Sequence, residues 1–406
     1  MQPQTRERIN AQIRDEMERD HFPEGFPTLP EIPGGRYTDP DFYDLEVEHL
    51  WKKSWLCAVR ADEIPNTGDH TLFERIGASV VIVRGEDGKV RAFHNTCRHR
   101  GAPLVEAAGS QKRLICRYHA WSYDLAGNLK TVPEEYDFGD FDKCARGLLP
   151  VSCEVWDGWV FINFDTEAGP LMDHLASIHP DLRDLSMDNL RVKGRLNYRI
   201  SCNWKAAYDA FLEAYHVKAI HPKTVAMLLD PAGTAIGLFT GGHTRMALPK
   251  RFNRGGGTWG TEADNYDIPT VPEVFRENNV AYGIFPNTVS PFDSAGFPLI
   301  SFWPVSKDEC ECELIFIGAG SEDENSENSE YWKEFVKNYD IIQMEDFQFL
   351  SGIQKSLNSG AFTGMQLCYQ ERRIYWFHEQ IDRAIGEDRI PENLRVEKLL
   401  SDFVER

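Results

Sequence analysis

The spacing of hydrophobic positions changes along the chain and predicts different elements in its two parts. Ile9, Ile13 and Met17 recur at helical spacing, so residues 1–20 predict an amphipathic helix, and a Pro- and Gly-rich connector follows over 21–40. β-Branched and apolar runs then predict strands at 72–76, 79–84, 89–94, 112–116, 150–155 and 159–164. Asp157-Gly158 between the last two runs is a hairpin signal. This part predicts a small all-β unit.

Beyond residue 165 the pattern becomes mixed. A strand over 194–201 runs into a helix over 203–220, long β segments follow at 282–304 and 311–318, and helical spacing returns at 330–356 and 369–386. We expect an α+β domain in which helices flank an antiparallel sheet. The predicted organisation is an N-terminal helix and connector (1–45) packed on the C-terminal domain, an all-β domain (46–165) and the α+β domain (166–406).

Charge and cysteine content narrow the classes of function. The chain of 406 residues carries 44 basic and 64 acidic residues, a net charge of −20, which disfavours binding to nucleic acid or to anionic membranes. No apolar run reaches the roughly 18 residues that span a membrane. Nine cysteines are scattered rather than patterned as a disulfide framework. We expect a soluble, cytoplasmic protein with reduced thiols.

The first candidate site combines two cysteines with two histidines. Cys97-x-His99 is followed by Cys116-x-x-His119, so each of two loops carries one thiol and one imidazole. Structural zinc sites usually pair like with like, whereas a Rieske 2Fe-2S centre binds one iron through two cysteines and the other through two histidines. The spacing therefore favours a Rieske cluster over zinc, which stays the alternative.

The second candidate site lies near the middle of the chain. Asp209, Glu213 and His216 are four and three residues apart, so a helix over 203–216 would place them on one face. His221 lies before Pro222, and the helix must distort or end before it for both imidazoles to bind one metal. Two histidines and a carboxylate form the ligand set of non-haem Fe(II) centres that bind O2. Two surface histidines on a helix are the alternative for this segment alone.

Together the two motifs resemble the α (large, catalytic) subunits of Rieske non-haem iron ring-hydroxylating oxygenases, over most of the chain. The resemblance implies a helix-grip-like catalytic domain after the Rieske domain, with Cys97, His99, Cys116 and His119 as ligands of the 2Fe-2S cluster. The family motif Cys-Pro-Tyr-His-Gly-Trp reads Cys116-Arg-Tyr-His-Ala-Trp121 here, with Arg for Pro and Ala for Gly.

The resemblance also implies roles around the mononuclear iron. Its ligands are His216, His221 and, by position, Asp346, with Glu345 and Asp340 as rivals for the third place. Glu213 occupies the place of the carboxylate that bridges the iron site of one subunit to the cluster of the next, where Asp is commoner. The motif also covers Asp209, and Asn203 matches a family residue near the iron.

The implied function is that of a terminal oxygenase which hydroxylates an apolar, aromatic substrate with O2. The sequence shows no dinucleotide-binding fingerprint, since Gly255-Gly256-Gly257 does not open a helix. We therefore expect a partner reductase to use NAD(P)H and to deliver the electrons, with or without a ferredoxin. The resemblance implies a head-to-tail homotrimer and leaves a β subunit open. The alternative reaction is oxidative N- or O-dealkylation, including that of quaternary amines. The alternative classes of protein are a Rieske electron carrier and a zinc-stabilised binding module. Candidate pocket residues are Phe211, Leu212, Phe285, Phe292, Phe302 and Trp303.

Overall fold

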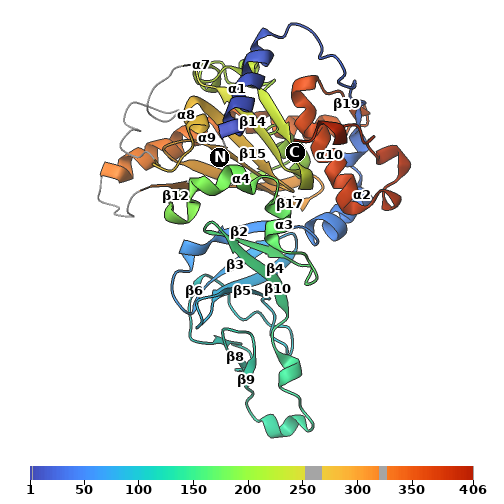
Figure 1. Cartoon of the computed structure of the whole chain (residues 1–406). Coiled ribbons are helices and arrows are strands. Elements are labelled where there is room, and N and C mark those ends of the chain that lie inside the picture. The colour runs from blue at the N-terminus through green and yellow to red at the C-terminus, as the bar shows by residue number, and fades with distance from the viewer. Residues whose placement is uncertain (2, 252–267, 320–326, 406) are drawn as a thin grey trace. The chain divides into compact units, whose positions relative to one another are not determined.

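The chain forms two compact units, one of which is inserted into the other in sequence. The computed structural model describes residues 1, 3–251, 268–319 and 327–405 (Figure 1). One unit is Trp51–Leu171, and the other combines Met1–Leu50 with Met172–Arg406. The predicted boundaries at 45/46 and 165/166 lie a few residues earlier. Gly255–Gly257 lies outside the described residues.

The Trp51–Leu171 unit is built from strands, and each of the six predicted runs overlaps one. A seven-stranded antiparallel sheet has the order β2-β11-β10-β5-β4-β3-β6. Its strands are β2 (Leu56–Arg60), β3 (Asp69–Arg75), β4 (Ala78–Arg84), β5 (Val90–His94), β6 (Gly109–Ser110), β10 (Pro150–Trp156) and β11 (Trp159–Asn163). A smaller sheet contains β7 (Leu114–Ile115), β8 (Ser122–Tyr123) and β9 (Leu129–Thr131).

The hairpin signal between β10 and β11 is confirmed. Asp157 and Gly158 both have positive φ, 47° and 80°, and the pair Trp156–Trp159 closes the hairpin around them. Positive φ at both central residues matches the right-handed twist of the flanking strands, and glycine and aspartate tolerate it best.

The other unit contains a second seven-stranded antiparallel sheet, in the order β12-β18-β17-β16-β15-β14-β13. Its strands are β12 (Arg191–Ile200), β13 (Ala235–Leu238), β14 (Thr244–Pro249), β15 (Asn278–Ile284), β16 (Thr288–Phe292), β17 (Phe297–Ser306) and β18 (Glu309–Gly318). The predicted α+β class, with helices beside an antiparallel sheet, is confirmed.

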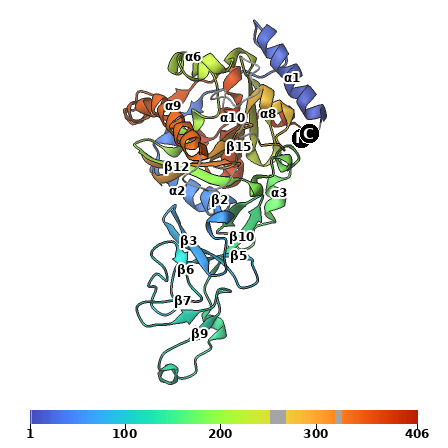
Figure 2. The same cartoon turned by 90° about the vertical axis from the view of Figure 1, so that its left-hand side faces the viewer.

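Three long helices accompany this sheet, as the sequence predicted. α1 (Pro3–Glu18) packs against β13 and β14, α9 (Glu327–Leu357) against β12, and α10 (Arg372–Ile385) against β13 (Figure 2). No helix among the described residues combines the length and the apolar character that crossing a membrane requires.

The predicted β segment 282–304 is confirmed as β structure and contains parts of β15, β16 and β17, because the chain turns at 285–287 and again at 293–296. Both faces of these strands are largely buried, so the sequence there is almost continuously hydrophobic, and such a run does not show where one strand ends and the next begins. The predicted helix 203–220 is interrupted: α5 (Trp204–Asp209) ends early, and α6 (Val217–Ile220) begins after an irregular turn.

A buried ion pair fixes the start of α5 to the N-terminal segment. The Lys205 Nζ lies 2.8 Å from Glu46 Oε1, and neither side chain is exposed. Trp204 Nε1 donates to Glu46 Oε2 at 3.2 Å. Burial raises the pKa of Glu46 and lowers that of Lys205, because each charge has lost its hydration. Each buried charge is therefore compensated only while the other residue of the pair is present.

Removing one partner is expected to destabilise this unit strongly. Lys205→Met should lower the free energy of unfolding by about 3–5 kcal/mol, since it leaves the Glu46 carboxylate buried without a counter-ion. The double variant Glu46→Leu/Lys205→Met should recover most of the loss. Urea unfolding followed by circular dichroism measures both, and a double variant less stable than Lys205→Met would contradict the explanation.

Candidate metal centres

Two loops of the Trp51–Leu171 unit bring Cys97, His99, Cys116 and His119 together. The first loop follows β5, and the second joins β7 to β8. Each loop closes one turn after its cysteine, with Gly101 N donating to Cys97 O (3.0 Å) and Ala120 N to Cys116 O (2.9 Å). Both cysteines are buried, and the ring centroids of the two histidines are 4.6 Å apart.

The surroundings of these four residues suit a cluster of iron and sulfide. Tyr123 Oη lies 3.4 Å from Cys97 Sγ, while burial raises the pKa of the Cys97 thiol. The His99 ring stacks on Trp121 at 4.8 Å, which fixes its plane. Its Nδ1 is buried and has no hydrogen-bond partner among the described residues. Two thiols and two imidazoles, one of which has this unpaired nitrogen, match the donor set of a Rieske centre.

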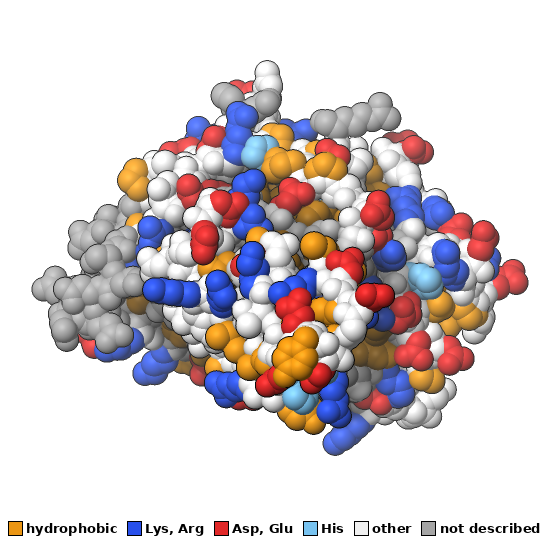
Figure 3. Space-filling model, turned by 90° about the horizontal axis from the view of Figure 1, so that it is seen from below, with side chains coloured by type: hydrophobic (Ala, Val, Ile, Leu, Met, Phe, Trp, Pro, Cys, Tyr) orange, Lys and Arg blue, Asp and Glu red, His pale blue; other side chains and the backbone are white. Residues whose placement is uncertain are grey.

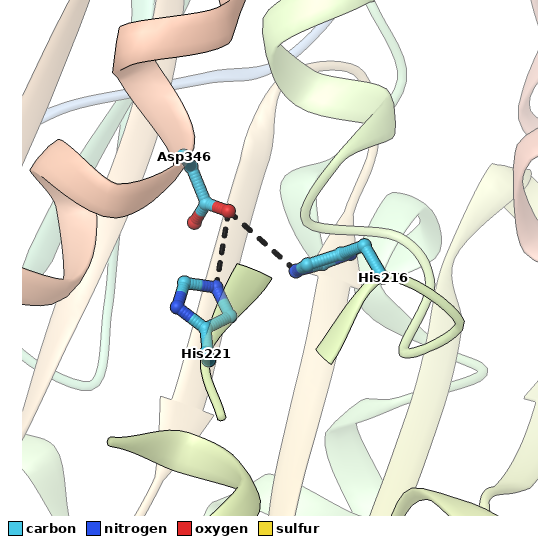
Figure 4. Close-up of side chains that lie close together, drawn as sticks. All are labelled: His216, His221 and Asp346. Atoms are coloured by element: carbon cyan, nitrogen blue, oxygen red, sulfur yellow. Dashed lines mark ion pairs between the residues drawn. The ribbon is translucent and has the colours of Figure 1, made fainter. Parts of the chain in front are cut away.

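A second group of ligand atoms lies in the other unit. One atom each from His216, His221 and Asp346 lie within 4.8 Å of one another. Figure 4 shows that both imidazoles point toward the carboxylate, with Asp346 Oδ1 3.0 Å from His221 Nε2 and 3.6 Å from His216 Nε2. The arrangement fits a divalent iron held on one side by two imidazoles and one carboxylate.

The interrupted helix explains how the two histidines meet. Glu213 accepts hydrogen bonds from the backbone N–H groups of Tyr215 and His216, so its carboxylate replaces helical bonds and the chain turns there. His216 precedes α6 and His221 follows it. The prediction that Asp209, Glu213 and His216 share one helix face is therefore wrong.

Each iron-site histidine has a carboxylate on its other ring nitrogen. Glu213 Oε1 contacts His216 Nδ1, and Glu345 Oε2 lies 2.7 Å from His221 Nδ1. Thr224 Oγ1 donates to the same Glu345 oxygen at 2.6 Å. Such contacts fix the tautomer and the orientation of an imidazole ligand. Burial alone would lower the pKa values of both histidines, but the adjacent carboxylates outweigh it and raise them.

The structure separates the other sequence candidates from this group. Asp340 accepts a hydrogen bond from Tyr198 Oη at 2.5 Å. Asp209 is buried against Tyr37, whose hydroxyl donates to it at 2.7 Å, and burial raises the pKa of Asp209 to about 7. Asn203 caps α5, accepting from Lys205 N at 3.0 Å. These three residues stabilise the surrounding unit rather than line the metal group.

An apolar cavity of about 140 Å³ adjoins the three ligand atoms. Of the predicted pocket residues, Phe211 lines it, whereas Leu212, Phe285, Phe292, Phe302 and Trp303 are not among its lining residues. Phe302 packs behind Phe211, with ring centroids 5.0 Å apart. The cavity therefore places an apolar molecule beside the metal group.

Two family models match the chain, and each covers one of these centres. The Rieske [2Fe-2S] domain matches residues 54–142, and the ring hydroxylating alpha subunit (catalytic domain) matches residues 187–387. The chain belongs to the Rieske non-haem iron ring-hydroxylating oxygenase α subunits. The residues present fit both cofactors of that family, a Rieske 2Fe-2S cluster and a mononuclear iron.

Relatives of this oxygenase subunit differ in what their names say they act on. It is 36% identical over 208 residues to the carnitine monooxygenase oxygenase subunit of Escherichia coli K12, which covers 50% of the chain and 56% of that relative. It is 35% identical over 195 residues to the biphenyl dioxygenase subunit alpha of Metapseudomonas furukawaii, covering 44% and 42%. The chain thus aligns with about half the length of these curated relatives.

A solved quaternary ammonium Rieske monooxygenase has the same fold. Its TM-score is 0.76 at 22% identity, over 90% of this chain and all of that one. At that identity the likeness concerns the fold alone.

Ala120 is one of two positions at which the loop between β7 and β8 departs from the family motif. Its φ is 58°, in the left-handed region, at the position that holds Gly in the motif. A side chain there costs about 1–2 kcal/mol compared with glycine. The loop has a hydrogen bond from Ala120 N to Cys116 O, so it closes on its cysteine although Ala120 is in a strained conformation.

Asp346 and its neighbour Glu345 are expected to behave differently when changed. Asp346→Ala should lose one iron per chain and leave the Rieske spectrum intact, as should His216→Ala and His221→Ala. Glu345→Gln should keep the metal but bind Fe(II) about 10–100-fold more weakly, because it loses the carboxylate that orients His221. Metal titration of the protein freed of mononuclear iron measures this. Full iron content in Asp346→Ala together with complete loss of the mononuclear iron in Glu345→Gln would mean that Glu345, and not Asp346, is the iron ligand.

Proposed function

We propose that the chain is the terminal oxygenase component of a multicomponent enzyme that uses O2. The observation that carries the proposal is the convergence of His216, His221 and Asp346 beside an apolar cavity, in a chain that also brings Cys97, His99, Cys116 and His119 together. An electron carrier needs only the two cysteines and two histidines of the cluster, and a zinc-stabilised module needs no cavity beside a metal.

When bound, the cluster would supply single electrons and the mononuclear iron would bind O2 for insertion into the substrate. The residues of the chain prepare this chemistry. Glu213 and Glu345 accept hydrogen bonds from the Nδ1 atoms of His216 and His221, which leaves both Nε2 atoms free for metal. The apolar walls around Phe211 offer an apolar substrate a surface to pack against beside the metal ligands.

The reaction type is proposed from both the cavity and the relatives. The similarity to a carnitine monooxygenase favours monooxygenation with oxidative dealkylation over the aromatic hydroxylation suggested by the sequence. The similarity to a biphenyl dioxygenase keeps ring hydroxylation as the second candidate. Either reaction suits a small molecule whose reactive end is apolar.

Electron delivery requires partner proteins, and we propose a NAD(P)H-dependent reductase, with or without a ferredoxin. Aromatic side chains near the cluster histidines support docking there: Tyr118, Tyr136 and Phe138 are exposed, and Phe138 lies 5.9 Å from the His99 ring. Figure 3 shows exposed hydrophobic side chains between charged ones of both signs. Assembly as a homotrimer and a cytoplasmic location belong to the same proposal.

Glu213 is proposed as the residue that connects the iron site to the cluster of a neighbouring subunit. Its carboxylate has about four acceptor positions, and the N–H groups of Tyr215 and His216 and the His216 Nδ1 occupy three. One position remains for an incoming cluster histidine. Glu213 is largely buried, which would strengthen such a bond.

Metal analysis tests the proposed function. The purified oxygenase is expected to contain about three irons and two acid-labile sulfides per chain, against two and two for a carrier. It should show a Rieske EPR signal on reduction. Cys97→Ser should abolish the signal and lower the melting temperature, because the two loops are held by the shared cluster. A colourless, zinc-loaded protein after iron-replete expression would overturn the proposal.

The role of Glu213 is tested by the rate at which O2 reoxidises the reduced cluster. Glu213→Gln keeps the size of the side chain but replaces an acceptor oxygen by a donor. Both metals should remain bound, while stopped-flow reoxidation with substrate present should slow by about 10–100-fold, because the histidine-to-histidine connection is lost.

Glu213→Asp is the matched control for charge, since it shortens the side chain by one methylene and keeps the carboxylate. It should retain part of the reoxidation rate. An unchanged single-turnover rate in Glu213→Gln would mean that electrons take another route.

A further inference from the structure

The cavity beside the iron ligands is lined almost entirely by apolar side chains. The apolar ones include Val225, Leu228, Met246, Leu248, Val289 and Ile300, from α7 (Val225–Leu228), β14, β16 and β17, and polar groups are contributed by the metal-ligand candidates, Glu213, Asn279, Tyr339 and Gln343. Its volume of about 140 Å³ is close to that of the apolar cavity of about 150 Å³ that binds benzene in an engineered protein. The reactive end of the substrate is therefore about the size of one ring.

The charges that line this cavity are acidic. Glu213 and Asp346 are its carboxylates, and no Lys or Arg is found among its described lining residues. A carboxylate on the substrate would meet no basic side chain among these residues, and Glu213 would repel it.

Gln343 is a polar lining residue, and its hydrogen bonding is incomplete. Its side chain is 2% exposed, and its Oε1 is buried without a hydrogen-bond partner in the described part of the chain. It lies on α9, one turn before Asp346. Native structures rarely leave a buried acceptor unpaired.

Another buried glutamine of the same helix shows the contrast. Gln354 accepts from Asn203 N at 2.7 Å through Oε1 and donates to Asp308 Oδ1 at 2.9 Å through Nε2. Both ends of that amide are used within the fold. The unpaired oxygen of Gln343, which lines the cavity, is therefore not a general property of the buried glutamines of α9.

We infer that Gln343 recognises the substrate, and that the substrate is a one-ring-sized apolar molecule carrying an uncharged hydroxyl or N–H donor and no carboxylate near its reactive end. This inference rests on the proposed oxygenase function. The donor would complete the hydrogen bonding of Gln343 Oε1 and would place the apolar part of the molecule beside the metal ligands.

Four ligands with the same ring separate the possibilities: toluene, benzyl alcohol, benzoate and benzyltrimethylammonium. Binding to the iron-loaded oxygenase is measured by calorimetry without O2 or reductant, so that the result does not depend on turnover. Benzyl alcohol is expected to bind about tenfold or more tightly than toluene, because only it pairs the buried acceptor. Benzoate is expected to bind most weakly.

Gln343→Leu should abolish the preference, so that toluene binds at least as tightly as benzyl alcohol, and Gln343→Asn should keep part of it. Asn279→Leu, a change at the other amide lining the cavity, is the matched control and should leave the preference unchanged. Iron content and circular dichroism establish that each variant is folded and loaded.

Three results would overturn the inference: tighter binding of benzoate or benzyltrimethylammonium than of benzyl alcohol, an unchanged preference in Gln343→Leu, or its loss in Asn279→Leu instead. None of these touches the proposed function, which fails separately if the iron and sulfide content or the Rieske signal is wrong.

Discussion

The meeting of Asp346 with two imidazoles is the contact on which the catalytic unit depends. Burying a carboxylate and two histidines beside an apolar cavity costs free energy unless each group has a binding partner. A metal ion can bind all three only if their ligand atoms converge. The chain achieves this by ending α5 early, so that His216 and His221 lie on either side of the short α6. The outer carboxylates then hold the two rings in place.

The four ligand residues of the Rieske centre are brought together in a simpler way. Each of its loops carries one thiol and one imidazole within four residues, and backbone hydrogen bonds close each loop on its own cysteine. Local geometry alone orients the ligands of one loop, and the sheets beneath need only bring the two loops together. This explains why Ala120 can occupy a left-handed position, since its strain is confined to one turn.

The same difference decides what the sequence could reveal. Cys97, His99, Cys116 and His119 form a local pattern whose spacing has a chemical meaning, so it could be read without a structure. The interruption of the helix at Asp209 was hidden, because residues 203–216 have helical spacing and only the contact of Glu213 with the backbone breaks it. Asp346 was placed by resemblance rather than by physics. Gln343 gave no signal, since an unpaired amide oxygen is a property of packing.

Helix α9 carries Gln343, Glu345 and Asp346 within four residues, and a helix has a fixed rise of about 1.5 Å per residue. The Cα atoms of Gln343 and Asp346 are thus about 4.5 Å apart along the axis. A substrate held by its polar group at Gln343 presents to the metal the atoms at a set number of bonds from that group. The pitch of one helix would then decide the regiochemistry of oxidation, and a homologous substrate lengthened by one methylene would still be oxidised at the same number of bonds from its polar group.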